Sequence, residues 1–211
     1  MPRITENMEK RRQRILTAAE SLIRKTGEVD FNMQVLAETA EVSFATPFNQ
    51  FGSKNGILLA LLGARIDKEL NRLRAVTGEP LERVLDLADH STSVYLADTD
   101  LYRPILRSVQ TAGFKPFPEQ AENVFELWAL ALDGVSTSNL LADNVNLQDV
   151  SRSLHFAYAS ALLQWAMGNL ADEEFREQAR FLVIGSLLRW LTPDARRQLL
   201  AVIERRIQPK L

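Results

Sequence analysis

The sequence predicts an all-α protein with a small N-terminal domain, residues 1–55, and a larger C-terminal domain, residues 56–211. Apolar residues recur at helical spacing along almost the whole chain. No segment alternates convincingly between apolar and polar residues, and valine and threonine are not clustered as they are in strands. The breaks between the periodic segments carry glycine, proline or helix-capping residues. About nine or ten helices are expected.

The N-terminal domain contains three predicted helices and leads into a fourth. The first carries an apolar stripe from Ile15 to Ile23 and is ended by Gly27. Asn32 is a suitable cap for a short second helix. The third is expected to begin at Ser43. Ser53 can cap the fourth, a long amphipathic helix.

The C-terminal domain is predicted to consist of longer helices. They are expected over residues 81–98, 101–113, 118–141, 150–170 and 173–191. Pro193 then opens a last short helix, because proline is favoured at the first helical position.

Composition places the chain among ordinary globular proteins and excludes several classes of site. Hydrophobic residues make up 46% and charged residues 25% of the 211 residues. With no cysteine, the chain cannot form disulfides or thiolate metal sites. Its apolar runs fall short of the roughly 18 residues that a membrane span needs, and no secretory signal is recognisable. We expect a cytoplasmic protein that contacts no membrane.

Charge is distributed unevenly along the chain. Residues 1–65 hold nine basic and seven acidic residues, although the whole chain has a net charge of −2. Four basic residues gather near the start, at positions 10, 11, 12 and 14. Such a cluster is most often a solvated helix start, and attraction of nucleic acid phosphates is the alternative.

Short helices with tight connections are typical of a helix-turn-helix unit, whose second helix lies in the DNA major groove. The residue pattern strengthens this interpretation. It is similar, over some fifty residues, to the N-terminal pattern of the tetracycline-repressor (TetR) family, and the matching positions are Ala18, Ala19, Leu22, Gly27, Leu36, Ala37, Ala40, Val42, Ser43, Thr46, Phe48, Phe51, Ser53, Lys54 and Leu58. The C-terminal part resembles the family only in the number and length of its helices. The resemblance implies a DNA-binding domain in residues 1–55, followed by an effector-binding and dimerisation domain.

The third helix is expected to have an inner and an outer face. Phe44, Ala45 and Asn49 fall on the outer face, where asparagine can bind adenine and an apolar side chain can contact a thymine methyl group. Solvated amides with no DNA contact are the alternative. The residues that the resemblance places at the DNA are Gln34, Ser43, Phe44, Ala45, Thr46, Phe48, Asn49 and Lys54.

Several residues depart from the family pattern, among them the pair Asn55-Gly56, which replaces the acidic residues that usually follow Ser53-Lys54. Glu41 stands in the turn where glycine is common, so a strained left-handed backbone is expected there. Phe48 replaces a common tyrosine and lacks a hydroxyl group. Pro47 has no N–H to offer the Ser43 carbonyl, so a distorted or tightened first turn is expected.

Two further sites are expected in the C-terminal domain. Aromatic and histidine side chains on four helices suggest a mainly apolar effector pocket, although most such residues pack in a core; they are Tyr95, Tyr102, Phe125, Trp128, His155 and Tyr158. The last two long helices suit a homodimer contact, with burial inside one subunit as the alternative. The candidate contact residues are Leu154, Ala157, Ala161, Phe175, Ala179, Leu182 and Ser186.

Catalysis finds no support in the sequence. Asp86 and His90 are spaced like metal ligands on a helix, but a third ligand is lacking and a solvated contact is the commoner arrangement. We therefore expect no catalytic residue, metal or cofactor. The prediction is a homodimeric repressor that leaves a palindromic or near-palindromic DNA operator when a small apolar effector binds. The alternative is a TetR-like ligand-binding or protein-interaction module whose DNA surface has decayed.

Overall fold

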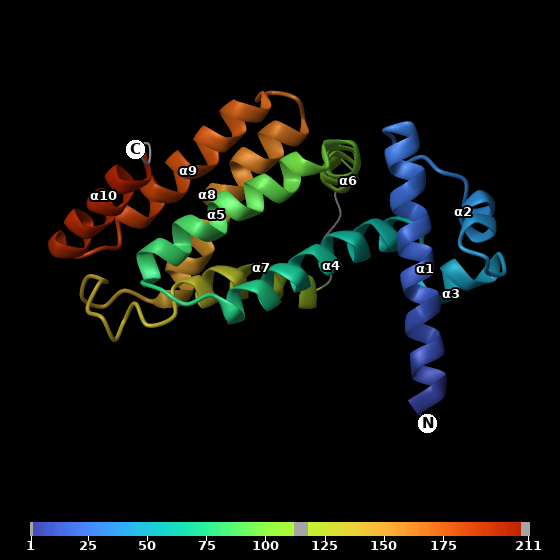
Figure 1. Ribbon diagram of the computed structural model, residues 1–211, viewed down its shortest axis with the longest axis horizontal. Helices are drawn as coiled ribbons and strands as arrows, with labels where there is room; N and C mark the ends of the chain where they lie inside the picture. The colour runs from blue at the N-terminus through green and yellow to red at the C-terminus, as the bar shows by residue number, and fades with distance from the viewer. Residues whose placement is uncertain (1, 112–117, 208–211) are drawn as a thin grey trace. The chain divides into compact units, whose positions relative to one another are not determined.

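The computed structural model describes residues 2–111 and 118–207, and these residues form ten helices (Figure 1). Within those ranges no strand occurs, only an isolated bridge between Leu141 and Leu191. The predicted all-α class and the number of helices are confirmed. None of the helices in the described ranges is both long and apolar enough to cross a membrane.

The chain divides into two compact units. The first contains the residues up to Arg65 together with the segment from Asp98 through α6, and the second contains Ile66–Ala97 and the helices α7 to α10. Both units therefore draw on separate segments of the sequence. The functional boundary between residues 55 and 56 stays a prediction, because a compact unit need not coincide with a functional domain.

The first unit is built around α1 (Pro2–Thr26), against which α2 (Met33–Thr39), α3 (Ala45–Phe51) and α6 (Thr99–Thr111) pack. The N-terminal part of α4 (Lys54–Ala75) completes it. Apolar stripes of these helices meet in one core, which includes the fully buried residues Ile15, Ala19, Ile23, Leu36, Ile57 and Ile105. An ion pair joins α1 to the start of α6, with Arg24 donating to Asp98 at 2.8 Å. This core fixes α2 and α3, the two helices that the sequence predicts at the DNA.

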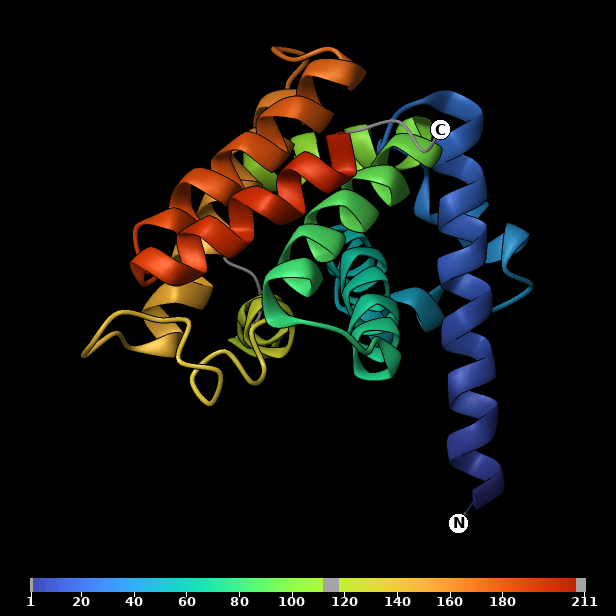
Figure 2. The same ribbon diagram turned by 60° about the vertical axis from the view of Figure 1, so that its left-hand side comes forward.

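The second unit contains a closed set of four helices. Helix α8 (Leu147–Ala166) packs against α7 (Pro118–Ala131) and α9 (Asp172–Leu188), and α5 (Pro80–Ala97) packs against both α7 and α9. Figures 1 and 2 show α8 and α9 running side by side. Trp165 and Phe175, both fully buried, stack at 5.1 Å between α8 and α9. Each helix therefore buries one face in the interior of this set.

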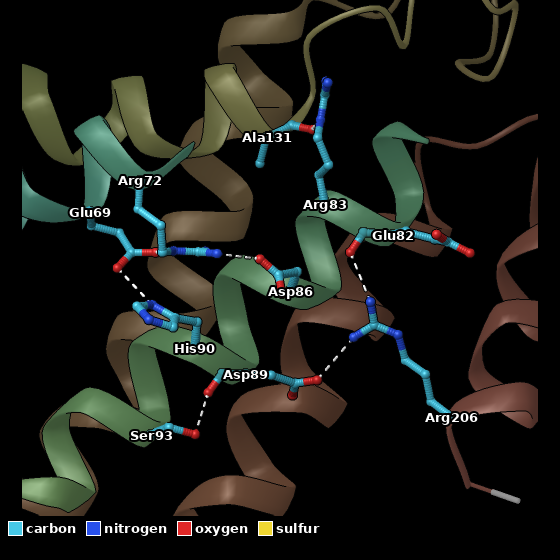
Figure 3. Close-up of polar contacts among 10 residues, drawn as sticks. All are labelled: Glu69, Arg72, Glu82, Arg83, Asp86, Asp89, His90, Ser93, Ala131 and Arg206. Carbon is cyan, nitrogen blue, oxygen red and sulfur yellow. Dashed lines mark hydrogen bonds and ion pairs between the residues drawn. The ribbon is translucent and has the colours of Figure 1, made fainter. Parts of the chain in front are cut away.

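Helix α10 (Pro193–Ile207) lies beside α5. Arg206 of α10 reaches the Asp89 carboxylate at 3.1 Å and the Glu82 carbonyl oxygen at 3.0 Å (Figure 3). Arg205 pairs with the Glu82 carboxylate at 3.2 Å. These partly exposed pairs add little stability individually, but together they orient the last helix.

Several predicted helix boundaries differ from those observed by a few residues, and two of the differences have a clear local cause. Helix α7 ends at Ala131 and not near residue 141, because Gly134 and Asn139 adopt positive φ angles of 81° and 54° within a series of turns. Helix α3 begins at Ala45 and not at Ser43. The cause is the first turn of α3, which is described with the site below.

Candidate nucleic-acid interface and ligand pocket

Helices α2 and α3 form the helix-turn-helix, and residues near α2 determine its geometry. Asn32 caps α2 as predicted, because its side-chain oxygen accepts a hydrogen bond from the Gln34 N–H at 2.7 Å. Glu41, just after α2, has a φ of 53°, which confirms the expected left-handed turn. The Val42 N–H then donates to the Ala37 carbonyl oxygen at 3.0 Å. This hydrogen bond closes the helix end and directs the chain into α3.

The residues predicted to fix the angle between the two helices lie in the core. Leu36, Ala37, Ala40 and Phe51 are buried, and Val42 packs against the same cluster. Gly56, at the start of α4, leaves no room for a side chain, because a Cβ atom there would overlap the Phe51 carbonyl oxygen. Close backbone packing between the end of α3 and the start of α4 therefore sets the position of α3.

The outer face of α3 carries the side chains predicted to read bases. Phe44, Ala45, Phe48 and Asn49 are exposed, with 56% of Phe44 and 39% of Phe48 open to solvent. The two phenyl rings contact each other edge to face, with centroids 5.4 Å apart. The outer face of α3 therefore presents two packed phenyl rings beside the Asn49 amide, and the helix carries no acidic residue.

The first turn of α3 is tightened at Pro47. The Ser43 carbonyl oxygen accepts from the Thr46 N–H at 2.9 Å, in the spacing of a 3₁₀ turn, because Pro47 has no N–H to donate. Ser43 and Thr46 also share a side-chain hydrogen bond of 2.8 Å. Pro47 itself is buried. The tightened turn is as expected, but the carbonyl finds a new partner, and Phe44 rather than Ser43 occupies the cap position.

Lys54 lies at the first residue of α4, where a cation is unfavourable. Its ammonium group binds Asp30 at 2.8 Å and sits 5.3 Å from the centre of the Phe31 ring. This hydrogen bond lowers the pKa of Asp30. Sequence reasoning missed Asp30, since no spacing rule connects residues 24 positions apart. Gln34, the remaining predicted contact, is exposed on α2 and donates to Glu38 at 3.2 Å.

In the basic cluster on α1, Lys10, Arg11 and Arg14 are exposed and Arg12 is half-buried. Part of the charge of this cluster is used within the chain. Lys10 binds Glu6 at 2.6 Å, and Arg14 lies 3.7 Å from Glu41. Arg12 stacks over the Phe51 ring at 4.5 Å. The two exposed ion pairs are weak.

The predicted pocket residues are divided between the two units. Tyr102 packs against the core of the first unit. In the second unit the rings of Trp128 and Tyr158 contact each other at 5.9 Å, and Tyr95 lies 6.5 Å from Trp165. Tyr95, Trp128 and Tyr158 are buried, each less than a tenth exposed. Their rings therefore pack in the core of the second unit and do not line a cavity.

Phe125 and His155 lie at a real cavity or beside it. Phe125 lines a pocket of about 390 Å³, bounded by α7 and the first turns of α8, together with Ala129, Leu147 and Arg152. His155, one turn beyond Ser151 of the pocket wall, contacts the Phe125 ring edge to face at 5.1 Å. Burial lowers the pKa of His155 to about 4, so its ring is neutral near pH 7.

The candidate dimer residues are mostly enclosed within a single chain. Leu154, Ala161, Phe175 and Ala179 are at most 1% exposed. Ala157, Leu182 and Ser186 are half-buried, and Ser186 shares a 2.7 Å hydrogen bond with Ser153 of α8. The apolar side chains that do reach solvent in this region include Phe156 of α8, Met167 just after α8 and Phe181 of α9.

Asp86 and His90 bind separate partners instead of sharing an ion (Figure 3). Asp86 accepts from Arg72 of α4 at 2.7 Å, and His90 pairs with the buried Glu69 at 2.8 Å. Glu69 also binds Arg72 at 2.7 Å. The four residues are one polar network between α4 and α5, and the described residues contain no group of three potential metal ligands.

Several solved structures share this fold. A TetR-family regulator from Pectobacterium atrosepticum is 19% identical, with a TM-score of 0.72 over 89% of this chain and 97% of that one. A TetR regulator from Rhodococcus sp. RHA1 is 18% identical, with a TM-score of 0.68 over 86% and 98%. FadR of Thermus thermophilus, a TetR-family repressor solved with lauroyl-CoA, is 27% identical, with a TM-score of 0.63 over 82% and 94%.

Sequence comparison gives a shorter match. The helix-turn-helix transcriptional repressor KstR of Mycolicibacterium smegmatis is 34% identical over 83 residues, which cover 38% of this chain and 41% of KstR. The match thus spans less than half of that relative. No protein-family model matches the chain. The resemblance to the TetR family of transcriptional regulators, predicted from the N-terminal residues, is therefore confirmed by the shared fold and by a local match to a repressor.

Proposed function

We propose that the chain is a ligand-responsive transcriptional regulator of the TetR type, a repressor that binds operator DNA as a homodimer and releases it when a small, mainly apolar effector binds. The observation that carries the proposal is the outer face of α3. Phe44 at the cap, and Phe48 and Asn49 on the outer face, are exposed on the second helix of a helix-turn-helix. None of these three side chains contributes to the buried core. Such a regulator acts where its operator is, in the cytoplasm, and performs no catalysis.

The DNA contacts divide by chemistry. Asn49 suits a base edge, because its amide can donate and accept at an adenine. Lys54 suits a phosphate, and its partner Asp30 is 91% exposed, so the ammonium can exchange one anion for another. One copy of α3 reads few base pairs, so two copies on a palindromic or near-palindromic operator supply the specificity.

Release by an effector would follow from a shift in population. A ligand that binds the second unit more tightly in one arrangement favours that arrangement, and the spacing of the two α3 helices then no longer fits successive major grooves. The strength of release is limited by the ligand's differential affinity for the two arrangements.

Fluorescence anisotropy with the DNA that flanks the chain's own gene tests this function. We expect sequence-selective binding that weakens steeply with salt. Asn49→Ala should reduce the binding free energy for the preferred sequence by about 1–3 kcal/mol and relax the selectivity among sequences. Lys54→Ala should instead weaken binding to all sequences, and the slope of log affinity against log salt concentration should fall by about one.

The control variant is Arg197→Ala, which removes an exposed cation from α10 and should leave DNA binding unchanged. A decayed DNA surface predicts a different result, since neither Asn49 nor Lys54 would then matter. Absence of any salt-sensitive, selective binding would reject the repressor proposal.

A further inference from the structure

The pocket between α7 and α8 differs from the aromatic set that the sequence suggests. Its walls are apolar at Phe125, Ala129 and Leu147. The polar side chains of Gln148 and Ser151 and the charged side chains of Glu126 and Arg152 complete them. Its volume, about 390 Å³, falls in the range of roughly 300–1,000 Å³ that is typical of small-molecule sites.

The two charges at this pocket are not equivalent. The Glu126 carboxylate is bound by Arg74 of α4 at 3.0 Å, which offsets part of its negative charge. Arg152 forms no ion pair within the described residues. Its guanidinium carbon lies 5.8 Å from the centre of the Phe125 ring, which holds the cation beside the aromatic wall.

Neighbouring groups do not cancel this positive charge. Asp149, one turn earlier on α8, is exposed and is not part of the pocket lining. His155, one turn later, contacts the Phe125 ring and is neutral near pH 7. The pocket therefore combines an apolar interior with one available guanidinium group.

We propose that this pocket binds an amphipathic monocarboxylate, with its apolar chain against Phe125, Ala129 and Leu147 and its carboxylate on Arg152. A guanidinium group presents parallel N–H donors that match the two oxygens of a carboxylate. A cationic ligand would be repelled, and a neutral alcohol would gain only the apolar contact. The inference deepens the proposed function, on which its role as an effector rests.

Calorimetric titration of the full chain without DNA tests the site. The probes are octanoate, 1-octanol and octylamine, which share a chain and differ in charge. Octanoate should bind about tenfold more tightly than octanol, as expected for one charge-assisted hydrogen-bonded contact near a surface. Octylamine should bind most weakly.

Variants then locate the binding. Arg152→Met keeps an unbranched apolar stem, so the affinity for octanoate should fall to the affinity for octanol. Ala129→Leu fills the pocket and should lower the affinity for both probes. The matched control is Arg197→Met, which removes an exposed arginine of α10 and should change neither affinity. Circular dichroism confirms that each variant is folded.

Two results would overturn the inference: equal affinity of the wild-type chain for octanoate and octanol, or a preference for octanoate that survives in Arg152→Met. Both are read without DNA. Failure of the chain to bind any operator counts against the proposed function alone. Octanoate that binds through Arg152 but does not release DNA supports this site and rejects only its role as an effector.

Discussion

Phe44 and Phe48 give the outer face of α3 a firm apolar surface beside Asn49. Their edge-to-face contact at 5.4 Å restrains both rings, and such pairs stabilise by about 0.5–1.5 kcal/mol beyond their buried area. An apolar side chain in the major groove can distinguish thymine by its methyl group. The pair therefore predicts which chemical feature of the operator α3 reads.

Replacing thymine by uracil in the operator tests this readout, because it removes the methyl group and leaves base pairing intact. At the thymine that faces Phe44 we expect a loss of about 0.8 kcal/mol, the contribution of one buried methyl-sized group, measured by anisotropy. In Phe44→Ala the same replacement should have no effect. Equal sensitivity in the two proteins would contradict the contact.

At His155, burial makes stability depend on pH. The pKa of His155 is lowered from 6.5 to about 4 in the folded chain. Between these values the unfolded chain binds a proton that the folded chain does not. The free energy of unfolding therefore falls as the pH drops from about 6.5 toward 4, by up to about 1.4 kcal/mol per pH unit, and His155 has no such effect above that window.

Substituting His155→Phe should remove this contribution while keeping an aromatic ring beside Phe125. Urea unfolding at pH 7 and pH 5 would show a smaller loss of unfolding free energy in the variant than in the wild type, by roughly 2 kcal/mol. The comparison isolates one group, since the remaining titratable residues are shared. Identical losses would show that the His155 ring is accessible to protons in the folded chain.

Among the elements, the helix-turn-helix is set by backbone geometry as much as by its core. Glu41 holds a left-handed conformation that glycine would adopt without strain. Gly56 allows the start of α4 to approach the last carbonyl groups of α3. Its presence in a helix is therefore required by packing, although glycine lowers helix propensity.

Gly56→Ala should destabilise the chain by about 1–3 kcal/mol, the usual cost of overpacking, because its Cβ atom would overlap the Phe51 carbonyl oxygen. Gly185→Ala is the matched control. Gly185 lies within α9, and no atom of the same chain lies within 4 Å of the place that an alanine Cβ would take, so this alanine should cause no comparable loss of stability. Thermal unfolding of both variants decides the matter, and two similar shifts would argue against a close approach at Gly56.

The fold was largely predictable at this scale, and the reasons are local. The cap at Asn32, the helix end at Gly27, the left-handed Glu41 and the tightened turn before Pro47 each depend on neighbouring residues. The end of α7 was not predictable from periodicity, because the residues after Ala131 keep an apolar pattern while Gly134 and Asn139 turn the chain.

For the molecule as a whole, the main question is how two copies associate. In a homodimer through α8 and α9, the exposed side chains of these helices would form the contact. Phe181 of α9 is 70% exposed and Phe156 of α8 is 63% exposed, which is costly for large apolar residues in water. Covering these side chains with a second copy would remove that cost.

Phe181→Glu should therefore disrupt the dimer, since a charge buried at an interface without a partner is strongly unfavourable. We expect at least a tenfold increase in the dissociation constant, measured by analytical ultracentrifugation. Leu200→Glu, at a half-exposed position of α10, should leave the association unchanged. A wild-type chain that is monomeric at micromolar concentration would refute the dimer, and an unaltered Phe181→Glu dimer would move the contact elsewhere.

The sequence by itself determined the helices, their caps, the inner and outer faces of α3 and the resemblance to one family, because these follow from spacing and from neighbours along the chain. The tertiary structure alone decided what covers each apolar face. It enclosed Leu154, Ala161 and Phe175 within one chain, brought Asp30 to Lys54, and opened a pocket at Arg152 while filling the space around Tyr158. Periodicity shows that a face is apolar, but only the packing of distant segments shows whether another helix, a ligand or a second copy covers it.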